Sequence, residues 1–140
     1  MAQYMLILHQ VPNTKVDLPR EKMLEVTKRY MSWADGLRAK GKIAGGERLG
    51  AGGVRLVKVK DGKPVVSDGP YAELKDVVGG YFVIEATNQV EAEAIATDCP
   101  HVAIAATNWI EIRPIVSMAE MRAQAAAGFV DSPRPRTSRV

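Results

Sequence analysis

The chain has 140 residues, of which 46% are hydrophobic and 25% charged, and these values are ordinary for a single globular domain. Its net charge is only +3, and three arginines lie in the last ten residues, so a dedicated nucleic-acid surface is disfavoured. A single cysteine, Cys99, excludes an internal disulfide, and we expect it to be buried as a small hydrophobic residue. The N-terminus does not resemble a signal peptide and no apolar run reaches about 20 residues, so we expect a cytoplasmic protein without membrane contact.

The first part of the chain reads as strand, helix, strand. The apolar run at 4–8 predicts a buried strand, and a helix is expected over 19–40, beginning with Pro19 and ending before Gly41. One stripe of this helix has residues at spacings of three and four: Met23, Thr27, Tyr30 or Met31, Ala34 and Leu37. Residues 42–49 predict a second strand, weakened by two adjacent glycines at 45–46.

A hairpin, a strand, a helix and a last strand follow. Residues 54–60 and 64–67 flank Asp61-Gly62, a pair typical of a tight hairpin turn. A strand is expected at 79–86, and Asn88 with Glu91 predicts the capped start of a helix through 98. The inward stripe of that helix is predicted as Val90, Ala94 and Ile95. Residues 108–115 alternate and predict the last strand.

This order predicts an α+β domain over 1–116: a ferredoxin-like antiparallel sheet with two helices on one face, plus a hairpin insertion. Residues 117–140 are expected to form a C-terminal helix and a disordered Arg/Pro tail. Strand alternation predicts an open face that carries Trp109, Glu111, Arg113, Tyr81, Val83 and either Leu6 or Ile7. Exposed patches of this kind mark interfaces, so we expect a homodimer through the open sheet face.

The segment SDGPYAELKDVVGGYFVIEA, with the later IEIRPI, resembles the DGPF-type branch of the YCII-related domain family. The matching residues are Asp68, Gly69, Pro70, Tyr71, Glu73, Lys75, Gly79, Gly80, Tyr81, Glu111, Arg113 and Pro114. Tyr71 replaces the phenylalanine of the namesake motif, and KGKIAGGERL, which contains Glu47 and Leu49, also looks like the family. The resemblance covers about residues 3–116. It implies a dimeric α+β barrel, an architecture shared with muconolactone-isomerase-like and chlorite-dismutase-like enzymes.

The DGP stretch indicates a rigid rim beside the sheet face, because Pro70 restricts its own backbone and that of Gly69. Asp68 is a candidate general base, Glu111 a second carboxylate and His9 a further base, although Asp68 could simply cap its turn. Candidate ligand-binding residues are Glu47, Gly69, Pro70, Tyr71, Glu73, Tyr81 and Arg113, the last as a clamp for a substrate carboxylate. One cysteine and two histidines supply no metal-ligand spacing, so neither a metal nor a cofactor is expected.

Related YCII members are thought to use a His–Asp pair whose histidine lies on the first helix, but residues 19–40 contain no histidine. The resemblance therefore transfers no catalytic histidine, and two functions stay open. One is a cofactor-independent small-molecule enzyme of the isomerase, lyase or dehalogenase type. The alternative is a non-catalytic dimeric ligand-binding or regulatory module, because similar domains accompany extracytoplasmic-function sigma factors. An RNA-binding domain shares the element order, but no basic sheet face is evident.

Overall fold

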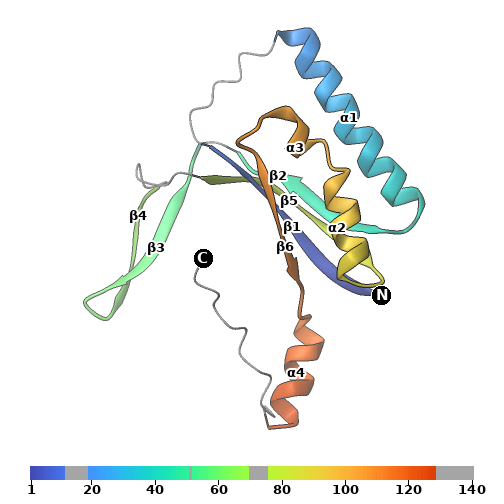
Figure 1. Ribbon diagram of the computed structural model, residues 1–140. Helices are drawn as coiled ribbons and strands as arrows, with labels where there is room; N and C mark the ends of the chain where they lie inside the picture. The colour runs from blue at the N-terminus through green and yellow to red at the C-terminus, as the bar shows by residue number, and fades with distance from the viewer. Residues whose placement is uncertain (12–18, 51, 70–75, 129–140) are drawn as a thin grey trace.

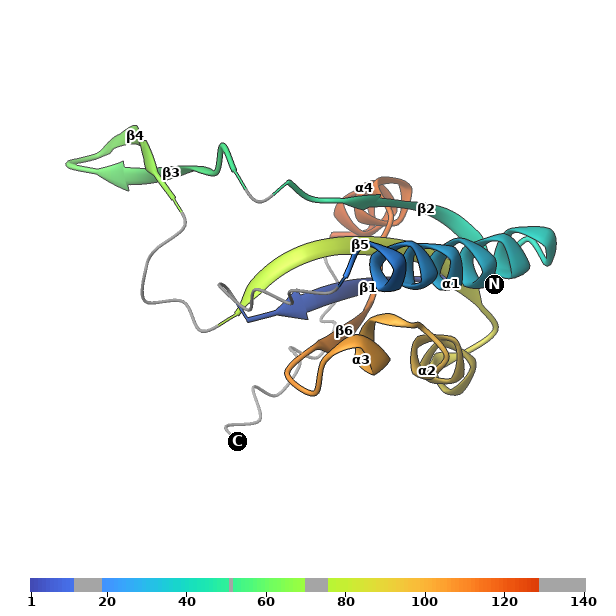
Figure 2. The same cartoon turned by 90° about the horizontal axis from the view of Figure 1, so that it is seen from above.

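The computed structural model describes residues 1–11, 19–50, 52–69 and 76–128. The elements in chain order are β1 (Ala2–Gln10), α1 (Arg20–Ala39), β2 (Ile43–Arg48), β3 (Arg55–Lys60), β4 (Lys63–Asp68), β5 (Val77–Ala86), α2 (Gln89–Thr97), α3 (His101–Ile104), β6 (Trp109–Pro114) and α4 (Met118–Ala126). Four strands form an antiparallel sheet in the order β2-β5-β1-β6, which can be followed in Figure 2. The helices α1, α2 and α3 lie on one side of this sheet (Figure 1). The predicted ferredoxin-like α+β fold is thereby confirmed.

Strand alternation separates a covered face from an open face of the sheet. Leu6 and Ile84 are completely buried on the covered face, where α2 contributes Ile95 to the same core. The sequence leaves Leu6 and Ile7 as alternatives for the open face, and the structure assigns that place to Ile7. Cys99 is also buried, as expected, and burial raises the pKa of its thiol to about 11, which disfavours the nucleophilic thiolate at neutral pH.

The predicted stripe of α2 is wrong in two positions. Val90 is 72% exposed and Ala94 is exposed, whereas Ala92, Ile95 and Ala96 are buried. The side chain of Asn88 accepts a hydrogen bond from the main-chain N–H of Glu91, so the predicted cap is present and the helix begins at Gln89. Burial of residues 92, 95 and 96 follows the helical spacing of three and four.

The strands β3 and β4 form a separate two-stranded sheet that extends from the end of the main sheet (Figure 1). Asp61 and Gly62 both have positive φ, 52° and 76°, as a tight two-residue hairpin turn of the predicted kind requires. The helix α4 follows β6, and the side chain of Ser117 caps it by accepting from the N–H of Glu120. No helix in the described part of the chain is long and apolar enough to cross a membrane.

Candidate functional site

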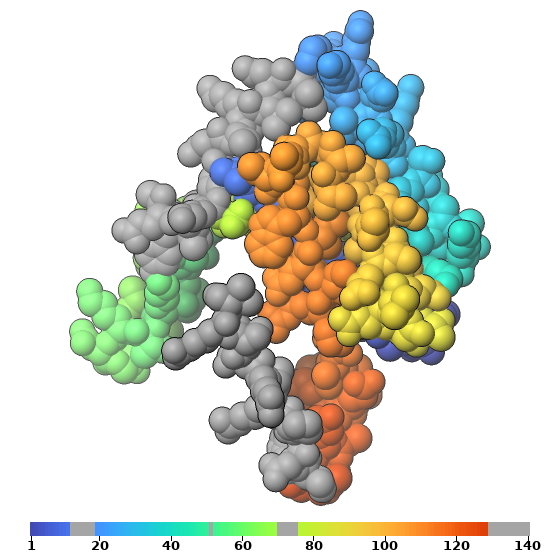
Figure 3. All heavy atoms as spheres, in the orientation of Figure 1, coloured from blue at the N-terminus to red at the C-terminus, as the bar shows by residue number. Residues whose placement is uncertain are grey.

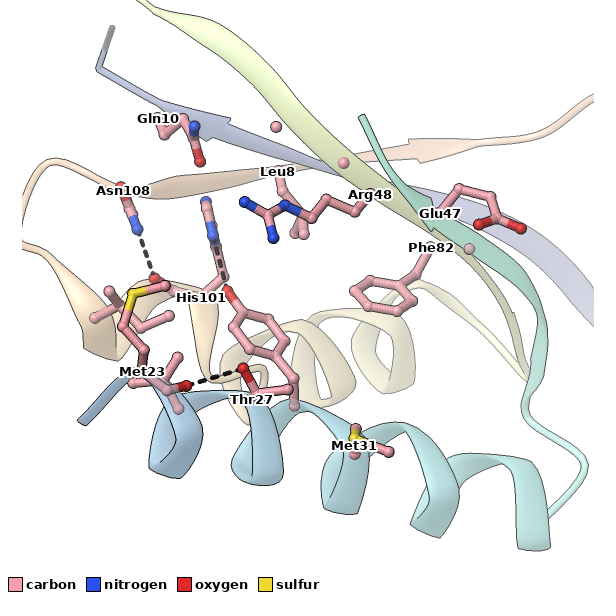
Figure 4. Close-up of a pocket in the computed structure, with 16 residues that line it drawn as sticks. Leu8, Gln10, Met23, Thr27, Met31, Glu47, Arg48, Phe82, His101 and Asn108 are labelled. Carbon is pink, nitrogen blue, oxygen red and sulfur yellow. Dashed lines mark hydrogen bonds between the residues drawn. The ribbon is translucent and has the colours of Figure 1, made fainter. Parts of the chain in front are cut away.

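A pocket of about 480 Å³ lies between α1, α3 and the covered face of the sheet (Figure 4). The helix α1 has no fully buried residue, and of its side chains only Trp33 and Leu37 pack against the core. The space between the rest of α1 and the sheet forms the pocket. Its apolar walls include Leu8, Met23, Val26, Met31, Phe82 and Ile104. Its polar side chains include Thr27, Tyr30, Arg48, His101 and Asn108. This volume and a mostly apolar lining with a few polar groups are typical of small-molecule sites.

Gly46 on β2 makes room for the aromatic wall of the pocket. A Cβ at this position would lie 2.5 Å from Cδ1 of Phe82 and 2.9 Å from the main-chain oxygen of Tyr81. The ring of Phe82 meets Trp33 of α1 edge-to-face, with 4.9 Å between ring centroids. Gly46, the second glycine of the pair that weakens the predicted strand, is therefore needed to leave space for Phe82.

His101 and Tyr30 form a hydrogen-bonded pair in this pocket. The Nε2 atom of His101 lies 2.8 Å from the main-chain oxygen of His9, and its Nδ1 atom lies 3.1 Å from the hydroxyl of Tyr30. A carbonyl oxygen only accepts, so Nε2 carries the hydrogen and the neutral ring must accept the Tyr30 hydroxyl hydrogen at Nδ1. The lone pairs of the Tyr30 oxygen remain available to accept from a ligand.

Burial keeps this pair neutral. His101 is only 3% exposed, and burial lowers the pKa of its imidazole. Burial likewise raises the pKa of the Tyr30 hydroxyl. The side-chain amide of Asn108 donates to the main-chain oxygen of His101 at 3.1 Å and so fixes the short helix α3. The pocket thus presents one fixed acceptor, the tyrosine oxygen, with a hydrogen-bonded base behind it.

Arg48 supplies the positive charge at the pocket. It lies two residues beyond Gly46 on the same face of β2, and Figure 4 shows its guanidinium pointing between Leu8 and His101. The neighbouring Glu47, a predicted ligand-binding residue, also belongs to the lining of the pocket, but its carboxylate points away from the pocket in the same view. Arg48 is exposed, and among the described residues its side chain has no ion-pair or hydrogen-bond partner. An unpaired guanidinium beside an apolar pocket is suited to an anionic oxygen of a ligand.

The open face holds a second polar cluster, formed by predicted residues. His9 lies inside β1, and its Nε2 is 3.0 Å from Oε1 of Glu111 on β6. The His9 ring also stacks on Trp109 with 3.9 Å between centroids. Arg113 reaches Oε2 of Glu111 at 3.5 Å, and the Trp109 N–H donates to Asp76 at 3.3 Å. The structure therefore brings His9, Glu111 and Arg113 together.

Two more predicted residues lie on this face, on the next strands of the sheet. Glu47 of β2 is opposite Tyr81 of β5 in the antiparallel register, and Tyr81 is opposite Ile7 of β1. Ile7 is in turn opposite Glu111, so an aliphatic side chain separates Tyr81 from the charged cluster. The side chains of His9 and Glu111 are 14% and 35% exposed, which leaves this cluster half open to solvent.

Asp68 does not belong to either group. It lies on β4 of the hairpin, 88% exposed, and forms an ion pair with Arg55 on β3. The predicted pocket shared by Asp68, Glu111 and Arg113 is not formed within one chain, because the Asp61-Gly62 turn builds a hairpin that extends from the sheet. Gly69 follows, with its N–H bonded to the main-chain oxygen of Val54. The other predicted residues of this stretch, Pro70, Tyr71 and Glu73, lie outside the described residues.

The sequence does not predict the site roles of three polar residues that line the pocket: Tyr30, Arg48 and His101. The predicted helix ends at 98 and the next predicted strand begins at 108, but His101, which lies between them, begins a helix of four residues directly after Pro100. Tyr30 stands out in the sequence only as part of a helical stripe, and Arg48 only as part of a strand. The expected absence of a metal site is an inference from spacing, and no group of three or more potential ligands occurs among the described residues.

Comparison with known proteins supplies a family and a structural relative. No curated protein matches the chain. Among solved structures, the chain is similar to a 5-chloro-2-hydroxyhydroquinone dehydrochlorinase from Burkholderia phenoliruptrix, determined with 2,5-dihydroxybenzoquinone. The TM-score is 0.51 at 15% identity, over 84% of this chain and 96% of the other, which supports the fold. The family model for the YCII-related domain matches residues 2–119, so the protein belongs to the YCII-related domain family.

Proposed function

We propose that the protein binds a small, mainly apolar molecule with an acidic hydroxyl group and acts on it by proton transfer in the pocket beside α1. The observation that carries this proposal is the hydrogen-bonded pair of Tyr30 and His101. Because Nε2 of His101 carries the hydrogen, the oxygen of Tyr30 can accept a hydrogen bond from the ligand. Nδ1 of His101 can then accept the proton that Tyr30 passes on. Neither group requires a cofactor for this chemistry.

The proposed reaction moves one proton in two linked transfers. The substrate O–H bond breaks and its proton goes to the Tyr30 oxygen, while the original Tyr30 hydrogen goes to Nδ1 of His101. The negative charge that develops on the substrate oxygen is stabilised by the guanidinium of Arg48. If the substrate is bound as the keto tautomer of a chlorinated hydroquinone, the carbon next to the enol double bond is saturated and carries both hydrogen and chlorine. The enol oxygen then becomes a carbonyl, the double bond shifts toward that carbon, and chloride leaves with the electron pair of the C–Cl bond. The net result is loss of HCl.

The structural relative supports this reaction class. It is a dehydrochlorinase of a chlorinated hydroxyhydroquinone, so a protein of similar fold acts on an aromatic molecule that carries both hydroxyl groups and chlorine. Because the identity is 15%, we argue the roles of Tyr30, His101 and Arg48 from the pocket and transfer no residue roles from the relative.

Non-catalytic ligand binding is the second candidate, and the pKa of His101 favours it. Burial lowers that pKa, so the ring is a weak base and gains a proton only at an energetic cost. A ligand could then be held by Tyr30 and Arg48 without turnover, as in a regulatory module.

The experiment is a melting screen followed by a chloride-release assay with hydroquinones and catechols, each with and without chlorine. Wild type is compared with Tyr30→Phe, which removes only the hydroxyl, and with Asp68→Ala as the matched control on the exposed hairpin. Chloride release by wild type and the control, but not by Tyr30→Phe, supports the enzyme. A melting shift without chloride release supports the binding module. If none of the compounds changes the melting temperature of wild type, both candidate functions are contradicted.

We also propose a homodimer through the open face of the sheet. The support is that this face carries the half-exposed Trp109 together with Ile7, Tyr81 and Val83, and that His9 and Glu111 would become enclosed there. Light scattering of wild type and Ile7→Lys is the test, because a lysine at the centre of the face would leave a buried, unpaired charge. A monomeric wild type would contradict the dimer.

A further inference from the structure

The β3–β4 hairpin has one apolar face and one basic face. In its register Val57 is opposite Val66 and Val59 is opposite Pro64, and these four side chains share one face. The exposed fractions of Val57, Val59 and Val66 are 67%, 74% and 56%. The opposite face carries three lysines, Lys58, Lys60 and Lys63, together with Val65, which is less exposed than the three valines of the first face. We call residues 55–68 the arm and its apolar side the valine face.

The described part of the chain leaves the valine face uncovered. The arm is a separate two-stranded sheet, and Figure 3 shows it in green as a lobe at one side of the molecule. A lone two-stranded hairpin is only marginally stable in water and needs packing against another surface. Three exposed valines gathered on one side indicate that this surface belongs to a partner.

The position of the arm indicates where a partner would lie. In Figure 1 the arm and α4 leave the sheet at opposite ends, and both extend on the side away from α1, α2 and α3. They therefore frame the open face of the sheet. Its apolar strip, formed by Ile7, Tyr81, Val83 and Trp109, lies between them. A molecule seated on this face would meet both the strip and the arm.

The charges favour a second copy of this chain, with its sheet rather than its arm as the contact. The arm carries four basic side chains against two acidic ones: Arg55, Lys58, Lys60 and Lys63 against Asp61 and Asp68. The open face carries three acidic side chains against one basic one: Glu47, Glu85 and Glu111 against Arg113. Two arms would repel each other, whereas an arm as a whole and an open face attract at long range. The docked contact itself is apolar, because the lysines of the basic face then point away from the sheet toward solvent.

We propose that the arm of each subunit docks by its valine face on the rim of the open sheet face of a second copy, in a two-fold exchange. The inference rests on the proposed homodimer and adds to it the element that clasps the partner. Each dimer then contains two identical arm contacts, because a two-fold axis repeats every contact.

The test uses a double substitution that keeps the hairpin intact. Val57→Lys with Val66→Glu replaces a directly opposed apolar pair by a pair of opposite charges, without changing the net charge. The control is Val65→Glu, which introduces a carboxylate opposite Lys58 on the basic face. Dimer dissociation constants are measured by analytical ultracentrifugation. In a second measurement, a benzophenone amino acid replaces Val59, and crosslinked peptides are identified by mass spectrometry.

If the arm clasps the partner, the double variant raises the dimer dissociation constant by roughly 100-fold or more, since two arms each lose two buried valines, while the control changes it little. Crosslinks from position 59 are then intersubunit and lead to β5, β6 or α4. A dimeric wild type whose double variant dimerises equally well overturns the arm contact alone. A monomeric wild type overturns the arm contact together with the homodimer. Crosslinks from position 59 that stay within one chain also overturn the arm contact.

Discussion

The Nε2 atom of His101 lies 2.8 Å from the main-chain oxygen of His9, and this contact joins the pocket to the opposite face of the sheet. The ring of His9 is held on that opposite face by Glu111 and Trp109. His9 therefore has two roles. Its main-chain oxygen orients His101 in the pocket, and its side chain belongs to the cluster on the open face. A dimer that covers the open face would stabilise the geometry of the pocket through this residue.

The first prediction concerns pH and the stability of the fold. Burial lowers the pKa of His101 in the folded state below its ordinary value of 6.5, so in the window below 6.5 the unfolded chain binds a proton that the folded chain does not. The free energy that neutral His101 contributes to stability is present above pH 6.5, and it is lost as the pH falls toward the pKa of His101 in the folded state. Urea unfolding between about pH 5 and 7 should show stability decreasing on acidification by at most about 1.4 kcal/mol per pH unit from this residue.

His101→Gln provides the comparison, because its amide can still donate to the oxygen of His9 but does not titrate. The slope of stability against pH should be smaller for this variant than for wild type over the same window. Equal slopes would mean that His101 takes up its proton in the folded state as readily as in the unfolded state.

The second prediction concerns the two neighbouring glycines of β2. Gly46→Ala would place a Cβ 2.5 Å from Cδ1 of Phe82 and 2.9 Å from a main-chain oxygen, so we expect a loss of about 1–3 kcal/mol in the free energy of unfolding. Gly45→Ala is the matched control, because a Cβ at that position would meet nothing within 4 Å in the described part of the chain. We expect the control to stay within about 0.5 kcal/mol of wild type. Chemical denaturation of both variants measures the difference.

Gly46→Ala should also weaken ligand binding, because the added Cβ conflicts with the ring of Phe82. Phe82 forms a wall of the pocket, so displacement of its ring by Gly46→Ala should also reduce the melting shift caused by any ligand found in the screen. A Gly46→Ala variant as stable as Gly45→Ala would show that β2, as the edge strand, moves away from Phe82 at little cost.

The third prediction concerns Asp68. Its carboxylate is 88% exposed and pairs with an arginine that is 60% exposed, and ion pairs at such positions contribute little to stability. Asp68→Ala should therefore change the free energy of unfolding by less than about 1 kcal/mol and leave ligand-dependent melting unchanged. Loss of the ligand-dependent shift in Asp68→Ala would instead indicate that the hairpin completes a site in the assembled dimer.

Local signals in the sequence account for most of the fold. Asp61-Gly62 specifies its turn by two positive φ angles, and Asn88 specifies the start of α2 by one hydrogen bond, so both are readable from neighbouring residues. The open-face cluster of His9, Glu111 and Arg113 is also within reach of the sequence, because strand alternation assigns residues to faces.

The pocket is not readable in this way. The helix α3 has four residues, too few for a periodic pattern, so the sequence around His101 gives no sign of its burial. The distance of α1 from the sheet depends on how side chains of different elements pack, which no single segment encodes. Asp68 illustrates the opposite case. It belongs to a distinctive motif that predicts a site, but the structure places Asp68 on a hairpin whose direction the motif does not specify.

The last prediction concerns Arg48 and the charge of the ligand. The guanidinium points into the pocket without a partner in the described structure, so Arg48→Gln should weaken binding of an anionic or ionisable hydroxylated ligand by about 10- to 100-fold, the usual cost of losing a charged hydrogen bond. Glu47→Gln is the matched control, since Glu47 borders the pocket but its carboxylate points away from the pocket. Isothermal titration with one ligand and its O-methyl ether separates charge from shape. Arg48→Gln should affect the free hydroxyl compound and not the ether, because the ether cannot ionise. Equal losses for both compounds would mean that Arg48 shapes the pocket rather than binding an oxygen anion.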